Sequence, residues 1–169
     1  MQFKIGMGYD IHKLIIGRPL KLGGIEIPFT KGPKAHSDGD VLLHALIDAL
    51  LGATGKGDIG QHFPDTDAKW KDAKSTDMLV QVFKPIYERE WAVNNLDATI
   101  LTEQPKLKKY IPAMREHLAN ILQMEKMDVN IKAGTNEECG EIGRGEAIAA
   151  QVVVLLELRP RSKHPFSIT

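Results

Sequence analysis

Apolar and polar residues alternate at the start of the chain and recur at wider spacing further along. Residues 3–7 carry an apolar side chain at every second position, which predicts a β-strand. Residues 20–27 are apolar on both sides of Gly23-Gly24, which predicts a hairpin whose glycines permit a tight turn. Segments 31–39 and 55–67 are rich in glycine and polar residues, so we expect loops there.

The remaining elements follow from two kinds of apolar pattern. Apolar residues at helical spacing predict helices over residues 41–53, 75–89 and 111–122. Residues 91–101 and 129–133 are typical of strands. Residues 147–158 form a continuous apolar run with three consecutive valines, which favours a buried strand and leaves a helix as the alternative.

The order of these elements indicates the fold class. Strands and helices do not alternate regularly, which predicts an α+β fold, a small single domain in which a mixed sheet packs against helices. A chain of 169 residues is long enough to bury a core of its own. Residues 1–158 show neither a repeat nor a linker and are assigned to one domain. The basic, proline-containing residues 159–169 are expected to form a loosely held tail.

Composition narrows the class of protein. Basic and acidic residues are equal in number, so the formal net charge is zero and a nucleic-acid partner is not expected. Cys139 is the only cysteine, which excludes an intramolecular disulfide and suits a reducing compartment. No apolar run approaches the roughly 18 residues that a membrane span requires. The N-terminal residues do not resemble a signal peptide, so we expect a cytoplasmic protein with no membrane partner.

Three side chains suggest a metal site. Asp10 and His12 lie two apart at the end of the first predicted strand, and residues two apart in an extended segment point to the same side. His44, from the first predicted helix, could complete a set of one carboxylate and two imidazoles. Three protein ligands leave one position open on a tetrahedral zinc ion, as in catalytic sites. Pairs of the form Asp-x-His are also common on ordinary surfaces, so the motif alone leaves both interpretations open.

Polar residues are dense just before that helix. Asp38 and Asp40 can cap its N-terminus and favour its positive end, but capping does not explain His36. Asp40 also precedes His44 by four residues, so the two could share a helix face. One hypothesis is therefore that Asp40 orients the His44 ring.

Two further regions contain groups that suit a phosphorylated sugar. Residues 58–60 and 63–67 offer backbone donors, hydroxyls and carboxylates for a polyol, with an exposed acidic turn as the alternative. Residues 132–138 combine a cation, small residues, a hydroxyl and carboxylates, which suits a diphosphate and its magnesium ion. Arg144 lies between glycines and can bind a phosphate bidentately or pair with the glutamates at positions 141 and 146.

The order of these motifs is more specific than any one of them. In chain order they are Gly8-Tyr9-Asp10-Ile11-His12, Ala35-His36-Ser37-Asp38-Gly39-Asp40, His44-Ala45-Leu46, Gly57-Asp58-Ile59-Gly60, Phe63-Pro64-Asp65-Thr66-Asp67, Gln104-Pro105-Lys106, Lys132-Ala133 and Gly143-Arg144-Gly145-Glu146. The series spans roughly residues 3–158 and resembles the 2-C-methyl-D-erythritol 2,4-cyclodiphosphate synthase family.

The resemblance implies an assembly and a reaction. Members of that family are small α+β domains that form homotrimers with active sites between adjacent subunits. The implied substrate is 4-diphosphocytidyl-2-C-methyl-D-erythritol 2-phosphate, an intermediate of non-mevalonate isoprenoid biosynthesis. Its 2-phosphate attacks the β-phosphorus of the diphosphate in a metal-assisted intramolecular phosphoryl transfer, which closes the 2,4-cyclodiphosphate ring and releases CMP.

The resemblance also implies residue roles. Asp10, His12 and His44 would bind zinc, and Glu137 would bind magnesium or manganese between the phosphates. His36 and Thr135 match positions that stabilise the transition state. The implied substrate-binding residues are Asp10, His12, His36, Ser37, Asp58, Ile59, Gly60, Phe63, Pro64, Asp65, Thr66, Asp67, Thr102, Glu103, Gln104, Pro105, Lys106, Leu107, Lys108, Gly134, Thr135, Asn136, Glu137, Glu141 and Arg144. Arg144 and Glu146 match positions near the trimer axis, where a cavity can hold an isoprenoid diphosphate.

Two other functions are compatible with the same residues. A zinc phosphohydrolase could use the Asp10, His12 and His44 set to activate water. A non-catalytic trimer could bind nucleotides or isoprenoid diphosphates. The presence of His36 and Thr135 together with the three metal ligands favours the synthase.

Overall fold

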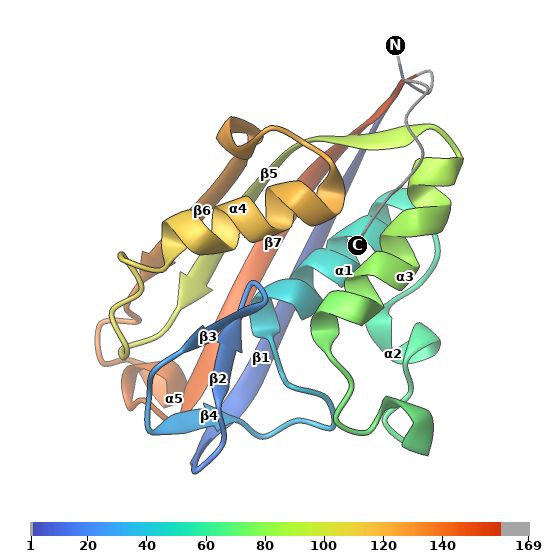
Figure 1. Cartoon of the computed structure of the whole chain (residues 1–169). Coiled ribbons are helices and arrows are strands. Elements are labelled where there is room, and N and C mark those ends of the chain that lie inside the picture. The colour runs from blue at the N-terminus through green and yellow to red at the C-terminus, as the bar shows by residue number, and fades with distance from the viewer. Residues whose placement is uncertain (1, 160–169) are drawn as a thin grey trace.

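A computed structural model describes residues 2–159 as one mixed sheet with helices α1, α3 and α4 against one face (Figure 1). The sheet strands are β1 (Phe3–Ile16), β4 (Lys31–Pro33), β5 (Trp91–Leu101), β6 (Val129–Gly134) and β7 (Ala147–Leu158). A separate hairpin pairs β2 (Leu20–Leu22) with β3 (Ile25–Ile27). The helices are α1 (Val41–Thr54), α2 (Ile59–His62), α3 (Ser75–Glu88), α4 (Ile111–Leu122) and α5 (Gly140–Gly143), with 3-10 turns η1 (Ala68–Trp70) and η2 (Lys126–Asp128).

The sheet has the strand order β4-β1-β7-β5-β6. Strands β5 and β6 are parallel, whereas every other neighbouring pair is antiparallel. The mixed sheet and the helices packed on it confirm the predicted α+β class. The predicted boundary of the domain at residue 158 coincides with the end of β7. Of the expected tail, only Arg159 belongs to the described residues, and its guanidinium pairs with Glu157.

The apolar run for which both a strand and a helix were considered is the central strand β7. Residues 147–158 form a strand, so the helical alternative is wrong. This strand pairs with β1 on one side and β5 on the other, and its side chains at positions 147–150 are buried on both faces of the sheet. Because both faces are covered there, the sequence shows no alternation.

Three of the predicted elements differ from the structure: one strand is longer than predicted, and two predicted loops contain short elements. The first strand continues to Ile16, well beyond the alternating residues 3–7. The predicted loop 31–39 contains β4, and the predicted loop 55–67 contains α2. Elements of three or four residues are too short to establish a hydrophobic period, so their sequences resemble loops.

Helix α1 packs directly on β1 at two glycines. A methyl group added at Gly6 would lie 1.9 Å from the Ala49 carbonyl oxygen, and one at Gly8 would lie 1.9 Å from the Ala45 carbonyl oxygen. Larger side chains at these strand positions would therefore force the helix outward. Gly6, Gly8, Asp10 and His12 share one face of β1 because alternate residues of a strand point the same way. The close approach consequently brings α1 beside Asp10 and His12.

Asp40 fixes the start of α1 and connects it to the hairpin. Its carboxylate accepts hydrogen bonds from the backbone N–H groups of Leu43, Gly23 and Gly24 at 3.1, 2.9 and 2.7 Å. The first contact is the expected helix cap. Burial raises the pKa of Asp40, although the three N–H donors oppose that effect. Asp40 is thus a structural residue that joins two elements beneath the metal site.

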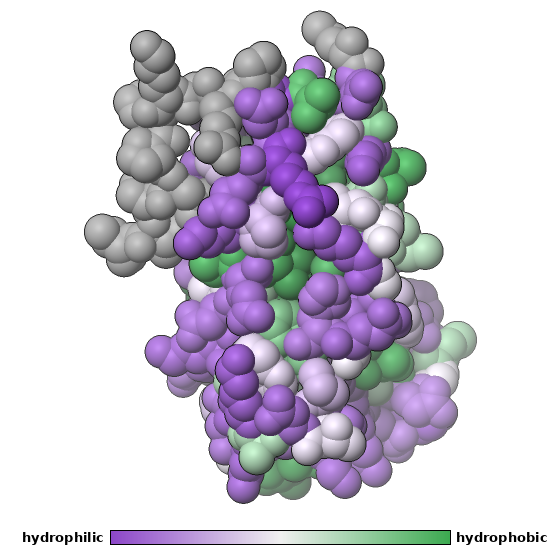
Figure 2. Space-filling view, turned by 90° about the vertical axis from the view of Figure 1, so that its right-hand side faces the viewer, coloured by the Kyte–Doolittle hydropathy of each residue, from purple (hydrophilic) through white to green (hydrophobic). Residues whose placement is uncertain are grey.

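The outer face of β1 carries an apolar stripe, consisting of Phe3, Ile5, Met7, Tyr9 and Ile11. These side chains are 43–71% exposed in the single chain, and Val153 of β7 lies beside Met7 in register. On the same face, β5 and β6 instead carry Asp97, Asn130 and Lys132 in a polar cluster. The side formed by α2 and α3 is also largely hydrophilic (Figure 2). The apolar stripe is therefore a local feature of the surface and a candidate contact face.

Among residues 2–159, none of the helices is both long enough and apolar enough to cross a bilayer.

Candidate metal centre and substrate cavity

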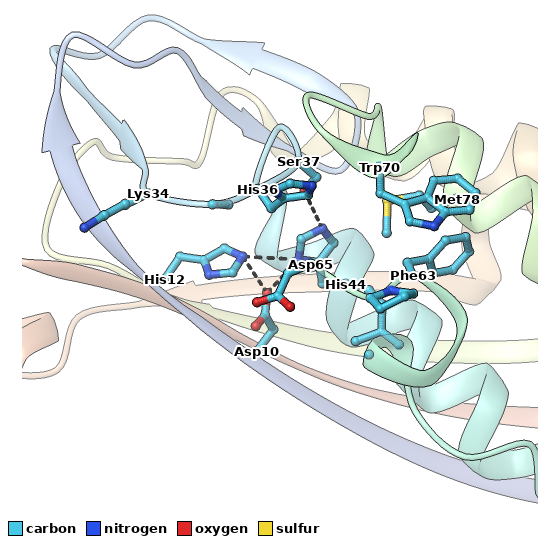
Figure 3. Close-up of a pocket in the computed structure, with 14 residues that line it drawn as sticks. Asp10, His12, Lys34, His36, Ser37, His44, Phe63, Asp65, Trp70 and Met78 are labelled. Atoms are coloured by element: carbon cyan, nitrogen blue, oxygen red, sulfur yellow. Dashed lines mark hydrogen bonds and ion pairs between the residues drawn. The ribbon is translucent and has the colours of Figure 1, made fainter. Parts of the chain in front are cut away.

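Asp10, His12 and His44 converge as one metal-binding group (Figure 3). Asp10 Oδ2 lies 3.2 Å from His12 Nε2 and 3.0 Å from His44 Nδ1, and the two ring nitrogens are 3.2 Å apart. The imidazole planes are perpendicular. These three residues form the only group of three or more possible metal ligands in the described part of the chain.

The spacing of the three ligand atoms fits a tetrahedral ion. Bonds of about 2.0–2.2 Å to nitrogen and oxygen place the ligand atoms of tetrahedral zinc roughly 3.3–3.6 Å apart. The observed separations of 3.0–3.2 Å are close to that range. A small outward movement would admit the ion. A set of one carboxylate and two imidazoles also suits zinc better than calcium or magnesium, which prefer oxygen ligands.

Protonation of the two histidines differs. Burial lowers the pKa of His12, and the nearby charge of Asp10 only partly opposes this. Burial also acts to lower the pKa of His44, but the hydrogen bond and charge of Asp10 outweigh it, so that pKa is raised. His44 can therefore hold a proton on Nδ1 toward Asp10. Because metal ligation requires neutral imidazole, an ion must displace this proton.

Two buried hydroxyls orient the His44 ring from the side opposite the metal ligands. His44 Nε2 lies 2.9 Å from Ser75 Oγ and 3.2 Å from Ser37 Oγ. Ser75 Oγ in turn donates to Asp38 Oδ1. A carboxylate, a hydroxyl and an imidazole thus form a chain that leaves Nδ1 directed at the ion, as partners of metal-bound histidines commonly do.

This arrangement corrects the proposed role of Asp40. Its side chain turns to backbone N–H groups and does not contact the His44 ring. Asp40 has the non-helical backbone of a helix-capping residue, with φ −67° and ψ 93°, so it does not share the helix face of His44. Asp38, the second predicted cap of α1, instead binds the start of α3 through Ser75.

The hydroxyl chain leads to a prediction for Ser75. Replacing it with alanine removes the nearer of the two hydroxyl partners of His44 Nε2, so we expect zinc affinity to fall about 10–100-fold. Competition with a chromogenic chelator measures this affinity. The neighbouring substitution Thr76→Ala is the matched control on the same helix turn. Unchanged zinc affinity in Ser75→Ala would show that Ser37 alone orients the ring.

A cavity of about 540 Å³ opens beside the metal-binding group (Figure 3). Of the predicted methylerythritol-binding residues, those that line it are Ser37, Ile59, Gly60, Phe63, Pro64 and Asp65, together with His36. Asp58, Thr66 and Asp67 belong to the same loops but do not line the cavity: Asp58 caps α2 and Asp67 caps η1. The cavity is also lined by Ala35 of the quoted motif and by Lys34, Trp70 and Met78, which the sequence did not single out.

His36 lies on the wall of this cavity without joining the metal group. Its Nε2 is 3.4 Å from the Asp67 carbonyl oxygen, and its backbone carbonyl accepts from the Asp72 N–H. The Phe63 and Trp70 rings, which line the same cavity, meet edge to face with their centroids 4.8 Å apart. The imidazole of His36 is therefore a polar group on a lining that is otherwise partly aromatic.

A second cavity, of about 300 Å³, lies at the ends of β5 and β6. The predicted residues that line it are Thr102, Pro105, Lys106, Leu107, Lys108, Gly134 and Thr135. Glu103, Gln104, Asn136 and Glu137 are next to these residues but do not line this cavity. The Glu103 carboxylate accepts from the Asn136 N–H at 2.9 Å, and Thr135 donates to Glu137. The two cavities share no lining residue: His36 lines the first and Thr135 lines the second.

Glu141 and Arg144 line neither of these two cavities. The Arg144 guanidinium pairs with Glu146 at 3.1 Å and with Glu141 at 3.4 Å. The internal ion pair considered for Arg144 is therefore present with both glutamates. An anion reaching Arg144 would have to compete with two carboxylates.

The fold and the site define a class of protein, an α+β domain with a candidate Asp-His-His metal centre on the wall of a cavity that both polar and apolar side chains line. The chain belongs to the YgbB family, whose sequence profile matches residues 3–157. It is 52% identical over 155 residues to the 2-C-methyl-D-erythritol 2,4-cyclodiphosphate synthase of Geobacillus kaustophilus, a match that covers 92% of this chain and 98% of that protein. The resemblance to the synthase family is confirmed.

Solved structures agree with this relationship. The bifunctional IspDF of Campylobacter jejuni matches with a TM-score of 0.89 and 42% identity, over 94% of this chain and 43% of that longer one. IspF of Plasmodium falciparum, solved as a CDP complex, matches with a TM-score of 0.82 and 30% identity, over 94% of this chain and 97% of its own.

Proposed function

We propose that this chain converts 4-diphosphocytidyl-2-C-methyl-D-erythritol 2-phosphate to 2-C-methyl-D-erythritol 2,4-cyclodiphosphate and CMP. The observation that carries the proposal is the convergence of Asp10, His12 and His44 on the wall of a cavity that the predicted sugar-binding loops also line. The names of the relatives support it. Phosphorus NMR of the purified protein with this substrate tests it.

The metal of the Asp10, His12 and His44 group is proposed to be zinc. When bound, zinc would polarise a phosphate oxygen and neutralise part of its charge. Glu137 is proposed to hold a magnesium or manganese ion at the diphosphate, because its carboxylate is a hard ligand on the loop after β6. The cytoplasm remains the expected location.

The reaction does not require the protein to supply a strong general base. An oxygen of the 2-phosphate, already an anion, forms a bond to the β-phosphorus. The bond from that phosphorus to the oxygen shared with the α-phosphate breaks, and CMP leaves with both electrons. The protein must hold two anions together and stabilise the charge of the transferring group. His36 and Thr135 would donate hydrogen bonds to that group, while the loops at residues 58–60 and 63–67 would hold the sugar.

We further propose a homotrimer with active sites shared between subunits. Two observations support it: the apolar stripe on β1 is exposed in the single chain, and the cavity beside the metal-binding group shares no lining residue with the second cavity, at the ends of β5 and β6. A neighbouring subunit would then supply the second cavity and bring its Thr135 to His36. An isoprenoid diphosphate at the trimer axis remains a candidate ligand, with Arg144 as its binding residue.

Light scattering tests the assembly. We expect a particle with three times the mass of one chain. Met7→Lys should reduce the proportion of trimer and the activity together, because it places a charge within the apolar stripe. The exposed substitution Met127→Lys, outside the stripe, is the matched control. A fully active monomer would exclude shared active sites.

A further inference from the structure

One wall of the zinc cavity is a segment that packs on the core through Phe63 but has few side-chain hydrogen bonds to the rest of the described chain. Residues 56–71 contain α2 and η1 and supply Ile59, Gly60 and Phe63 to the cavity. Two side-chain hydrogen bonds connect this segment with the rest of the described chain. Asp48 accepts from the Ile59 N–H at 2.7 Å, and His36 contacts the Asp67 carbonyl oxygen at 3.4 Å. The shorter contact therefore holds the end of the segment that contains α2.

Asp48 comes from the same helix as a metal ligand. It follows His44 by four residues in α1, so the two side chains emerge one above the other on one helix face. His44 Nδ1 points to the metal-binding group, and Asp48 Oδ1 binds the first backbone N–H of α2. A single rigid helix thus fixes both the metal ligand and the cavity wall.

The internal structure of α2 does not depend on Asp48. Asp58 caps α2 by accepting from the Gln61 N–H at 3.0 Å and from its side-chain amide at 2.8 Å. The Phe63 side chain is buried and packs on Trp70. Loss of Asp48 would therefore leave α2 formed and its neighbour Phe63 packed, while Ile59 and Gly60 would lose their fixed distance from His44.

We propose that Asp48 is a positioning residue for substrate, which fixes the Ile59–Gly60 wall of the cavity relative to the metal ligand His44. The proposal rests on the synthase function proposed above. Asp48 does not line the cavity, so it acts through the backbone of Ile59. The acceptor oxygen of Asp48 fixes the position of Ile59 and Gly60 before the sugar binds.

The test compares Asp48→Ala with Asp48→Asn. The amide keeps an acceptor for the Ile59 N–H, whereas alanine has none. Burial raises the pKa of Asp48 despite the bond from Ile59, and the charges of Asp58 and Asp10 act in the same direction. A neutral acceptor should therefore serve in its place. Thr54→Val is the matched control, because Thr54 bonds only to carbonyls of α1 itself.

In Asp48→Ala we expect the Ile59 amide to exchange its hydrogen about tenfold faster and KM to rise about tenfold. We expect kcat to fall less than KM rises and the zinc content to stay unchanged. Asp48→Asn and Thr54→Val should resemble the wild type in all of these measurements.

Each contrary result has a separate meaning. Faster exchange with an unchanged KM would overturn the positioning role, and so would an Asp48→Asn variant as impaired as Asp48→Ala. Loss of zinc in Asp48→Ala would show that the substitution disturbs α1 and its metal ligand His44 instead of the cavity wall. That result would also overturn the positioning role. A wild-type protein that fails to turn over would overturn the proposed synthase function, while the exchange of the Ile59 amide still decides whether Asp48 holds the wall.

Discussion

Removal of zinc should abolish turnover and leave the fold intact. The three ligands line the cavity, whereas α1 is held by its packing on β1 at Gly6 and Gly8 and by the cap at Asp40. Without the ion, Asp10 still accepts a hydrogen bond from His44, so no buried charge is left unpaired. A lost Lewis acid removes several kcal/mol of transition-state stabilisation, which corresponds to a rate loss of more than about a hundredfold.

Dialysis against a chelator, followed by metal analysis, circular dichroism and a rate assay on the same sample, measures this effect. Returning zinc should restore the rate. His62→Ala serves as a control for the loss of a histidine outside the metal site. This variant should keep its zinc, because His62 is exposed on α2 and its ring bonds to the Lys56 carbonyl oxygen. Active protein with much less than one zinc per chain would contradict the assigned metal, and unfolding on chelation would make the zinc structural.

His36→Ala should keep its zinc and lose most of its rate. The His36 ring lines the cavity but lies outside the group of metal ligands. If its ring donates a hydrogen bond to the transferring phosphoryl group, the loss of that ring should lower kcat about a hundredfold or more. Its contact with the Asp67 carbonyl oxygen also supports the cavity wall, and loss of that support would appear in KM.

Measuring kcat and KM separately therefore distinguishes the two roles of His36: kcat reports the contact with the phosphoryl group, and KM reports support of the cavity wall. His36→Gln is a useful second variant, since its amide can still donate a hydrogen bond, and a partial recovery of kcat is expected. Near-normal turnover in His36→Ala would reduce His36 to a loop residue. Zinc lost together with activity would show that His36 supports the metal centre.

The sequence predicted long elements well because their periods are long enough to recognise. The strand from Trp91 to Leu101 and the helix from Ile111 to Leu122 have the bounds that their patterns indicated. The Asp10 and His12 pair was also visible, because residues two apart in a strand share a face. Its connection with His44 depended on the glycine-mediated packing of α1, which no local pattern contains.

Contacts between distant segments account for what the sequence did not reveal. Ser75 lies 31 residues from His44 and meets it only because α3 begins beside α1. Lys34, Trp70 and Met78 reach the cavity in the same way. The role suggested for Asp40 was wrong for a different reason: spacing of four residues implies a shared helix face only when both residues have helical backbone, and Asp40 precedes the helix.

Phosphorus NMR of the purified, zinc-loaded protein with 4-diphosphocytidyl-2-C-methyl-D-erythritol 2-phosphate and magnesium tests the central claim most directly. The account predicts that the substrate signals are replaced by those of CMP and of a cyclic diphosphate, with no free phosphate, and that chelation stops the conversion. Release of inorganic phosphate would identify a zinc phosphohydrolase instead. Substrate that binds but persists unchanged would identify a non-catalytic binding protein, and either result would contradict the synthase.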